Sequence, residues 1–409
     1  MNQVIKFLAF SLVLMQASCG TADSSAGKQE EPKKVVKPDS VNHVVPEKRV
    51  FYRDSLLDFT ARYLAGLNQL CRNPFLKLEQ EPAWMDHRSQ SQKNWDKLLE
   101  DRIQPMMNWS AETFKPMLKD SLTVFYPFSG PDFLHVHYLY PNATRYILCA
   151  LEPISDLPDL LVLNPENRST YLKSLQNSLR DIYGKSYFIT NHMKEDLSKD
   201  KVRGVLPLFY VFLVRTGHEI LQIDPVALDS AGVLLDTLPE KKSPLLISGI
   251  RFRFRHENAD TLREMIYFST DISDKGLKKN PAIIKFVQQQ GSVNTFIKSA
   301  SYLLHYSTFS MMREQIMASS STIFQDDTGI PYKHFKSASS WRTVLYGNYT
   351  KPVKDFGSFT FQDDLDSVYS ASKGLPSLPF HLGYHWGDRK QSQRSEEHTS
   401  ELQSPCNLV

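Results

Sequence analysis

Polar residues follow three short apolar runs that read as strands, and their types suit the binding of a ligand. They are Ser129, Gly130, Asp132, Glu152, Asp326 and Asp327. In open parallel sheets, ligands bind just beyond the carboxyl ends of the strands. The sequence therefore predicts one site for a small polar or anionic molecule, provided that the third run lies parallel to the first two.

The first two groups have a spacing that is typical of nucleotide sites. A turn that opens a helix offers backbone N–H groups to an anion, and an acidic residue about 20 positions later binds a ribose. Gly130 and Glu152 have about this separation, so the stretch resembles the first motif of Rossmann-like folds, including class I methyltransferases. The resemblance implies an enzyme with a degenerate site as an alternative. It departs from the motif in having one glycine, and Pro131 lacks an N–H.

Other candidate groups have simpler structural interpretations. Asp326 and Asp327 could hold a cation or act as a base, but no third metal ligand lies at a telling spacing, so we predict no metal site. Residues 298–301 and the Ser269–Asp274 region are expected to cap helices. His135, His137 and His305 are expected at surface or satisfied core positions. The sequence contains no GxSxG, HExxH or P-loop motif, and it assigns no cofactor and no catalytic residue.

The pattern of elements predicts an α/β fold of the three-layer, Rossmann-like type with a mostly parallel sheet. Residues 122–153 read as strand, turn, short helix and strand, which is a βαβ unit with Asp132 as the helix cap. Residues 245–270 read as an added antiparallel hairpin, in which three arginines alternate with apolar residues. These are Arg251, Arg253 and Arg255. They could form an anion-binding face, although a solvated strand face is the simpler interpretation.

Helices are expected on both sides of these strands. The periodicity predicts N-terminal helices at residues 50–72 and within 90–118, and a fully apolar, buried helix at 204–217. Further helices are expected at 168–182, about 186–198, 280–290, 293–304 and 308–319. Short aromatic strands are expected from 335 onward, the last at 379–386. The three tryptophans of the N-terminal half, and Cys149 in its strand, are expected in the core. A disulfide between Cys71 and Cys149 is chemically allowed outside the cytoplasm.

The first 19 residues read MNQVIKFLAFSLVLMQASC, an apolar run that follows one lysine and precedes a cysteine. The run is too short to span the roughly 30 Å core of a bilayer as a helix and is typical of an export signal. It resembles a bacterial lipoprotein signal, which implies that Cys19 is lipidated. Gln16 departs from the leucine usual at that position, and an ordinary secretory signal is the alternative.

Residues 20–48 are polar and contain proline and lysine without an apolar period, which is typical of a disordered tether. Together with the signal, this indicates a protein of the Gram-negative cell envelope, anchored to the outer membrane through Cys19. The formal charge of +3 is small and dispersed along the chain. It argues against nucleic acid as a partner.

Residues 394–409 read RSEEHTSELQSPCNLV and resemble the conceptual translation of a common sequencing adapter. We interpret them as an artefactual tail, and a genuine polar tail of this composition would be disordered as well. Residues 49–393 are then expected to form a single α/β domain.

Four strings in that domain resemble an uncharacterised family of exported bacterial lipoproteins, and this resemblance implies no activity. The strings are YPFSGPDF, LEP, SASYLLH and QDDTGIPY. The leading hypothesis is therefore an envelope lipoprotein of unknown activity that binds a small polar or anionic molecule. The degenerate methyltransferase-like enzyme is one alternative, and a structural or interaction protein of the envelope is the other.

Overall fold

The computed structural model describes ten segments of the chain, and residues Val50–Val409 form one compact unit. The described residues are 55–69, 72–118, 122–185, 202–236, 245–298, 300–337, 341–349, 361–380, 382 and 399–403. The predicted signal, tether and Cys19, the predicted helix at 186–198 and Cys71 lie outside these residues.

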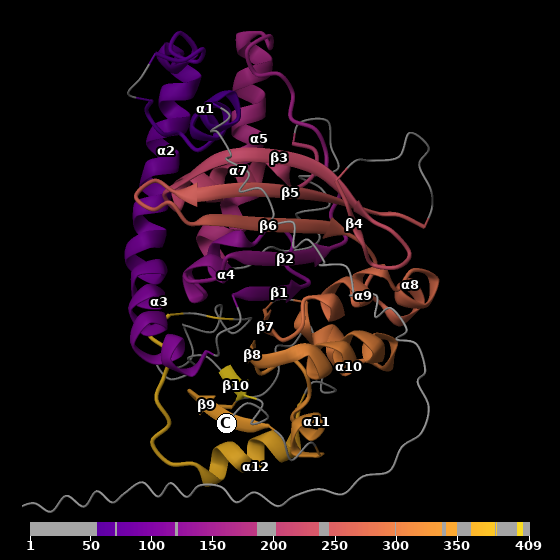
Figure 1. Ribbon diagram of the computed structural model, residues 1–409. Helices are drawn as coiled ribbons and strands as arrows, with labels where there is room; N and C mark the ends of the chain where they lie inside the picture. Colours follow the sequence, from indigo (N-terminus) through magenta and orange to yellow (C-terminus); the bar gives the residue numbers. More distant parts are fainter. Residues whose placement is uncertain are drawn as a thin grey trace, which may run out of the picture. The chain divides into compact units, whose positions relative to one another are not determined.

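The core of the fold is one ten-stranded sheet (Figure 1). The strands are β1 (Thr123–Pro127), β2 (Arg145–Ala150), β3 (His218–Leu228), β4 (Leu234–Leu235), β5 (Ile247–His256), β6 (Leu262–Ser269), β7 (Val293–Ile297), β8 (Ser320–Asp326), β9 (Arg342–Tyr346) and β10 (Thr399–Gln403). Their order is β4-β3-β5-β6-β2-β1-β7-β8-β10-β9. The five strands from β6 to β8 run parallel, while β5, β3 and β4 extend the sheet in antiparallel fashion.

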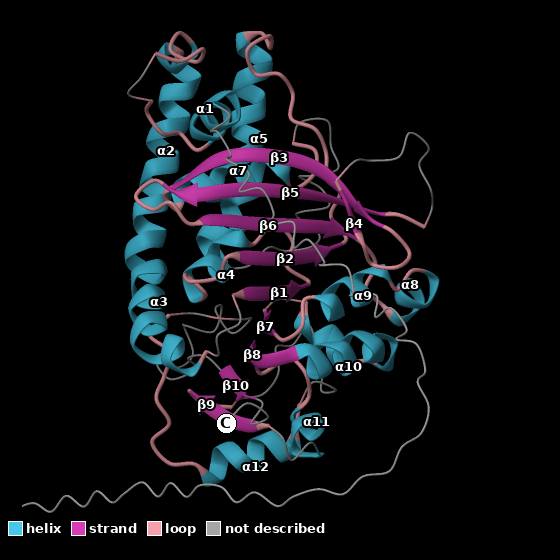
Figure 2. Cartoon of the chain, in the orientation of Figure 1, coloured by secondary structure: helices cyan, strands magenta, loops and turns pink. Residues whose placement is uncertain are grey.

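Helices cover both faces of the sheet (Figure 2). They are α1 (Ser55–Leu64), α2 (Pro82–Leu98), α3 (Gln104–Trp109), α4 (Phe133–Leu139), α5 (Pro165–Lys185), α7 (Leu206–Arg215), α8 (Asp274–Lys279), α9 (Ala282–Gln289), α10 (Ser310–Ser319), α11 (Tyr332–Ser337) and α12 (Asp363–Ala371). Alternate residues of β1 belong to two different cores: Val124 and Tyr126 pack with one, and Phe125 packs with the other. This alternation confirms the predicted three-layer α/β fold, because successive side chains of a strand point to opposite faces.

The βαβ unit formed by β1, α4 and β2 has the predicted form. Asp132 caps α4, and its carboxylate accepts a hydrogen bond from the backbone N–H of His135. β1 and β2 pair in parallel, with Thr123 opposite Arg145. All ten residues of α7 are buried, as its uniformly apolar sequence predicts, and Gly217 follows it with a φ of 77°. This is the left-handed conformation that glycine adopts at helix ends.

The prediction of a helix at residues 293–304 is wrong. Val293–Ile297 form β7, a central strand with all five residues buried between β1 and β8. A short apolar run of this kind fits a buried strand and a buried helix equally well by periodicity. The N-terminal helix also ends earlier than expected, because α1 stops at Leu64 and Gly66 takes a φ of 65°.

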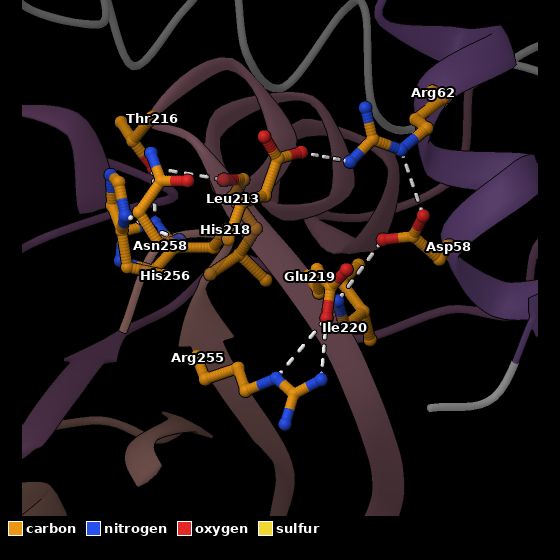
Figure 3. A network of polar contacts seen from close by, with 11 residues as sticks. Asp58, Arg62, Leu213, Thr216, His218, Glu219, Ile220, Arg255, His256 and Asn258 are labelled. Carbon is orange, nitrogen blue, oxygen red and sulfur yellow. Dashed lines mark hydrogen bonds and ion pairs between the residues drawn. The ribbon is translucent and has the colours of Figure 1, made fainter. Parts of the chain in front are cut away.

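The arginines of β5 are held by carboxylates of neighbouring strands. Arg251 and Arg253 both contact Asp224 of β3, and Arg255 contacts Glu219. Figure 3 shows the Glu219–Arg255 pair near Arg62 of α1, which bonds Asp58. Arg62 also forms an ion pair with Glu257. The alternative of an open anion-binding face is therefore not supported, since acidic partners already occupy the guanidinium groups.

The C-terminal part of the chain differs from the predicted run of aromatic strands. Its described residues include two helices, α11 and α12, and the strand β9 between them. Leu378, Phe380 and Leu382 pack into the core, and most of the predicted strand at 379–386 lies outside the described residues. Thr399–Gln403 form β10 between β8 and β9, antiparallel to both, so the expectation that the tail has no structure is wrong. An extended segment can pair there because each neighbouring strand offers unpaired backbone groups.

Two further expectations concern the core and the membrane. Trp84, Trp95 and Trp109 are buried as predicted, and so is the free thiol of Cys149. Burial raises the pKa of that thiol to about 12, although a backbone hydrogen bond from Phe128 acts in the opposite direction.

Within the described segments, none of the helices has both the length and the apolar character required for a membrane span.

Candidate functional site

The carboxyl ends of three adjacent parallel strands, β1, β7 and β8, carry a group of buried polar side chains. They are Asp132, His135, Lys298, Ser301, Asp326 and Thr328, and none is more than 2% exposed. Burying so many polar groups is costly unless they bond to one another. Their concentration where parallel strands end makes this the candidate site.

Asp132 is the centre of the first half of the site. Its Oδ2 lies 2.5 Å from Lys298 Nζ and accepts a hydrogen bond of 3.1 Å from the Tyr126 hydroxyl. Its Oδ1 lies 2.8 Å from His135 Nδ1. Burial acts to raise the pKa of Asp132, but His135 and Lys298 together hold it below its usual range. Burial lowers the pKa of His135, so its imidazole is neutral at pH 7.

The sequence after β1 explains why Asp132 lies here. Phe128 has a φ of 59° and Gly130 a φ of 52°, so two left-handed residues turn the chain sharply at the strand end. The turn is fixed by a hydrogen bond of 3.2 Å from the Ser129 N–H to the Cys149 carbonyl on β2. This bond uses the Ser129 N–H, and Ser129 is itself buried. The predicted anion cradle is thus occupied by the protein's own groups.

Asp326 is the centre of the second half. Its Oδ1 accepts hydrogen bonds from the Ser301 hydroxyl at 3.2 Å, from the Thr328 N–H at 3.1 Å and from the Thr328 hydroxyl at 2.7 Å. Burial and the neighbouring Asp327 carboxylate raise the pKa of Asp326 to about 7, against the effect of the three donors. A carboxyl pKa that burial and a second carboxylate raise toward neutral pH is a feature that functional carboxyl groups often have.

Among the described residues, two buried polar atoms of the site have no hydrogen-bond partner: Oδ2 of Asp326 and Nε2 of His135. Buried polar atoms are nearly always paired in folded proteins, with protein groups or with water. Two unsatisfied atoms at the ends of β1 and β8, on either side of β7, are therefore a physical reason to expect a bound molecule.

Lys298 connects the two halves. Its ammonium group bonds Asp132 and also interacts electrostatically with Asp326. Sequence reasoning missed its role, together with those of His135, Ser301 and Thr328. Lys298 follows β7 directly, so a correct assignment of residues 293–297 as a parallel strand would have placed it beside Asp132.

The remaining predicted residues are less central. Glu152 follows β2, where its carbonyl accepts a hydrogen bond of 2.8 Å from the Tyr267 hydroxyl. No contact recorded among the described residues joins Glu152 to Asp327. Asp327 borders a space with Gln325, Ile330 and Tyr332 that is too narrow for a water molecule. The described segments hold no group of three His, Cys, Asp or Glu side chains that could bind a metal ion.

Backbone strain is concentrated at the same strand ends. In the described part of the chain, Phe128 and Ala300 are the non-glycine residues with positive φ, and they follow β1 and β7. Left-handed conformations cost an ordinary residue about 1–2 kcal/mol. Such strain often accumulates in functional sites, where it is part of the positioning of the side chains.

Replacing Ala300 by glycine is expected to stabilise the protein by about 0.5–1 kcal/mol, because glycine adopts its φ of 51° without a steric penalty. Urea unfolding measures the change. Ala259→Gly, in the exposed turn after β5, is the control and should be neutral or slightly destabilising. Equal destabilisation in both variants would contradict the strain at Ala300.

A second polar group lies at the opposite end of the sheet, where β3 begins and β5 ends. The rings of His137 and His218 are 4.7 Å apart, and those of His218 and His256 are 5.4 Å apart. Figure 3 shows His218 beside Thr216, and His256 beside Asn258. Burial, assisted by Arg263 and His256, lowers the pKa of His218 to about 3. Burial also places the pKa of His137 well below its ordinary value.

In comparisons with known proteins, no family model, no curated protein and no solved structure matches the chain.

Proposed function

We propose that the chain is an envelope lipoprotein whose folded part binds a small polar molecule at the carboxyl ends of β1, β7 and β8. The observation that carries this proposal is the pair of unsatisfied buried atoms on Asp326 and His135. The strained backbone at Phe128 and Ala300 supports this proposal. Proteins keep such strain mainly where it holds functional side chains in position.

The binding experiment uses the folded part, which comprises residues 49–393 followed by the tail that supplies β10. Thermal unfolding is measured with a panel of sugars, amines, organic acids, nucleotides and divalent metals. A ligand that binds the native state raises the unfolding midpoint in proportion to the logarithm of its concentration. No shift with any class would contradict ligand binding and favour the third hypothesis, a structural or interaction protein of the envelope.

The membrane anchor rests on the signal sequence and is tested separately. We expect radiolabelled palmitate to be incorporated into the full chain expressed in a Gram-negative host, and to be lost in the Cys19→Ala variant. Cys149→Ala is the matched control, because its thiol is buried in β2 and should not affect labelling. Label that persists in Cys19→Ala would contradict the anchor.

A second candidate function is supported by the order of the parallel strands. β6, β2, β1, β7 and β8 are neighbours in that order and run parallel, so their order in the sheet, counted along the chain, is 3-2-1-4-5. This resembles the nucleotide-binding sheet of Rossmann-like folds, which class I methyltransferases share. The loop after β1 argues against it, since Pro131 has no N–H and Asp132 is engaged by Lys298. Binding of S-adenosylmethionine in a calorimetric titration would favour the enzyme.

A further inference from the structure

We propose that the ligand of this site carries a protonated amine that the carboxylate of Asp326 accepts, and a hydrogen-bond donor for the free imidazole nitrogen of His135. The inference rests on the proposed ligand binding and names the chemical class of the ligand. It narrows the sequence-based expectation of a polar or anionic molecule, because it excludes the anion.

The tautomer of His135 supplies the first argument. Its Nδ1 lies 2.8 Å from Oδ1 of Asp132 and 3.2 Å from Nζ of Lys298. Lys298 makes its shorter contact, 2.5 Å, with Oδ2 of Asp132. A lone pair on Nδ1 would repel the carboxylate at 2.8 Å, so Nδ1 carries the proton and donates it to Oδ1. Nε2 of the neutral ring is then a bare acceptor, and it is buried without a donor. A ligand at this atom must bring a hydrogen-bond donor.

The surroundings of Asp326 also favour a cationic ligand. Three donors converge on its Oδ1, while Oδ2 is unsatisfied. Asp327 adds a second carboxyl group next in the chain, so the two acidic groups repel one another when both are ionised. A cation at Oδ2 removes this repulsion, whereas an anion increases it and a neutral hydroxyl leaves it unchanged.

The third argument is that the cations around the site are already engaged. Lys298 bonds Asp132, and Arg102 donates to the carbonyls of Ile182 and Gly184. Arg313 donates to the carbonyls of Leu304 and Tyr306. An anionic ligand would therefore compete with Asp132 for the ammonium group of Lys298.

The charged and titratable groups that face Asp326, His135 and Lys298 decide how binding depends on pH. They are Asp132, Asp327 and Arg102. Asp327 in turn interacts with His305, which Arg313 and Lys333 also face. Burial and Asp327 raise the pKa of Asp326 toward neutral pH. Binding of a cation should therefore be weaker at pH 6, where Asp326 is protonated, than at pH 8, where it is ionised.

The test uses three two-carbon probes that differ in charge: ethanolamine, ethylene glycol and glycolate. Each is added at the same high concentration and ionic strength to the folded part used above, and the unfolding midpoint is recorded at pH 6 and pH 8. We expect ethanolamine to raise the midpoint by about 2 °C at pH 8 and by less at pH 6. Ethylene glycol and glycolate should give no comparable rise.

The Asp326→Asn variant removes the charge but keeps an oxygen for the Ser301 and Thr328 donors, so it should fold. It is expected to lose the ethanolamine effect and its pH dependence. Glu112→Gln, at an exposed position, is the control and should behave as the unmodified chain.

The outcomes separate the two proposals. A rise with glycolate or ethylene glycol instead of ethanolamine would overturn the amine class and leave ligand binding intact. An ethanolamine effect that persists in Asp326→Asn would overturn the assignment to this site. If neither the three probes nor any member of the ligand panel shifts the unfolding midpoint, ligand binding itself is overturned.

Discussion

The Lys298→Met variant is expected to lose about 3–5 kcal/mol of its free energy of unfolding. Lys298 Nζ lies 2.5 Å from Asp132 Oδ2, and both side chains are buried. Methionine has a similar volume but no charge, so the substitution leaves the Asp132 carboxylate in a low-dielectric interior without its counter-ion. Protonation of Asp132, which would limit the loss, also weakens its bonds to His135 and to the cap of α4.

Urea unfolding of four proteins tests this result: the unmodified chain, Lys298→Met, Asp132→Asn and the double variant. The double variant should be more stable than Lys298→Met alone, because asparagine keeps the helix cap and leaves no buried charge. Lys285→Met is the control, since its ammonium group is exposed and, within the described segments, donates to the Ser230 carbonyl. A loss at Lys298 no larger than at Lys285 would show that the buried pair contributes little.

Acidification from pH 7 to pH 4 is expected to destabilise the protein by several kcal/mol. His87, His137 and His218 are buried and neutral. The pKa of His218 is lowered from 6.5 to about 3 by burial, Arg263 and His256. Burial lowers the pKa of His87 to about 4. Between these values and 6.5 the unfolded chain binds more protons, so stability falls as the pH falls, by about 3 kcal/mol for His218 alone.

Asp326 acts in the opposite direction. Its pKa is raised to about 7, so the folded state binds the extra proton and gains stability as the pH falls from 7 towards 4. One carboxyl group offsets only part of the loss from several histidines. Asp132 has a lowered pKa, so its contribution is lost only at much lower pH.

The free energy of unfolding as a function of pH measures the effect. The His218→Phe variant should show a smaller loss between pH 7 and pH 4, because phenylalanine fills the same aromatic contacts without titrating. His334→Phe, at a partly exposed position of α11, is the control and should change the slope much less. Identical slopes in all three proteins would contradict a buried neutral His218.

Local signals explain which parts of the fold could be predicted. The β1–α4–β2 unit was predicted because its turn residues, its helix cap and its apolar strands agree with one another. The hairpin of β5 and β6 was predicted for the same reason, from alternation and a polar turn. β7 was missed because VNTFI is short and buried on both faces, so its periodicity does not distinguish a strand from a helix.

The candidate site was only partly predictable for a related reason. Asp132 and Asp326 were found because they follow recognisable strands. Lys298 was not, since its partner Asp132 is distant in sequence and the intervening topology decides whether they meet. Whether Nε2 of His135 lacks a partner depends on the orientation of its ring, and no sequence pattern predicts that orientation. The strand formed by the tail was missed because its pairing depends on the unpaired edges of β8 and β9.

The position of β7 in the sheet has a consequence for how the chain folds. β1 pairs Val124 with Asn294 of β7, so the centre of the sheet joins residues that are far apart in sequence. Contacts between residues so far apart in sequence slow folding, because the long loop between them must close before β1 and β7 can pair. The N-terminal half cannot complete its sheet until β7 has been synthesised. For a chain that is exported as we propose, we expect this delay to help the polypeptide stay unfolded until it has crossed the inner membrane.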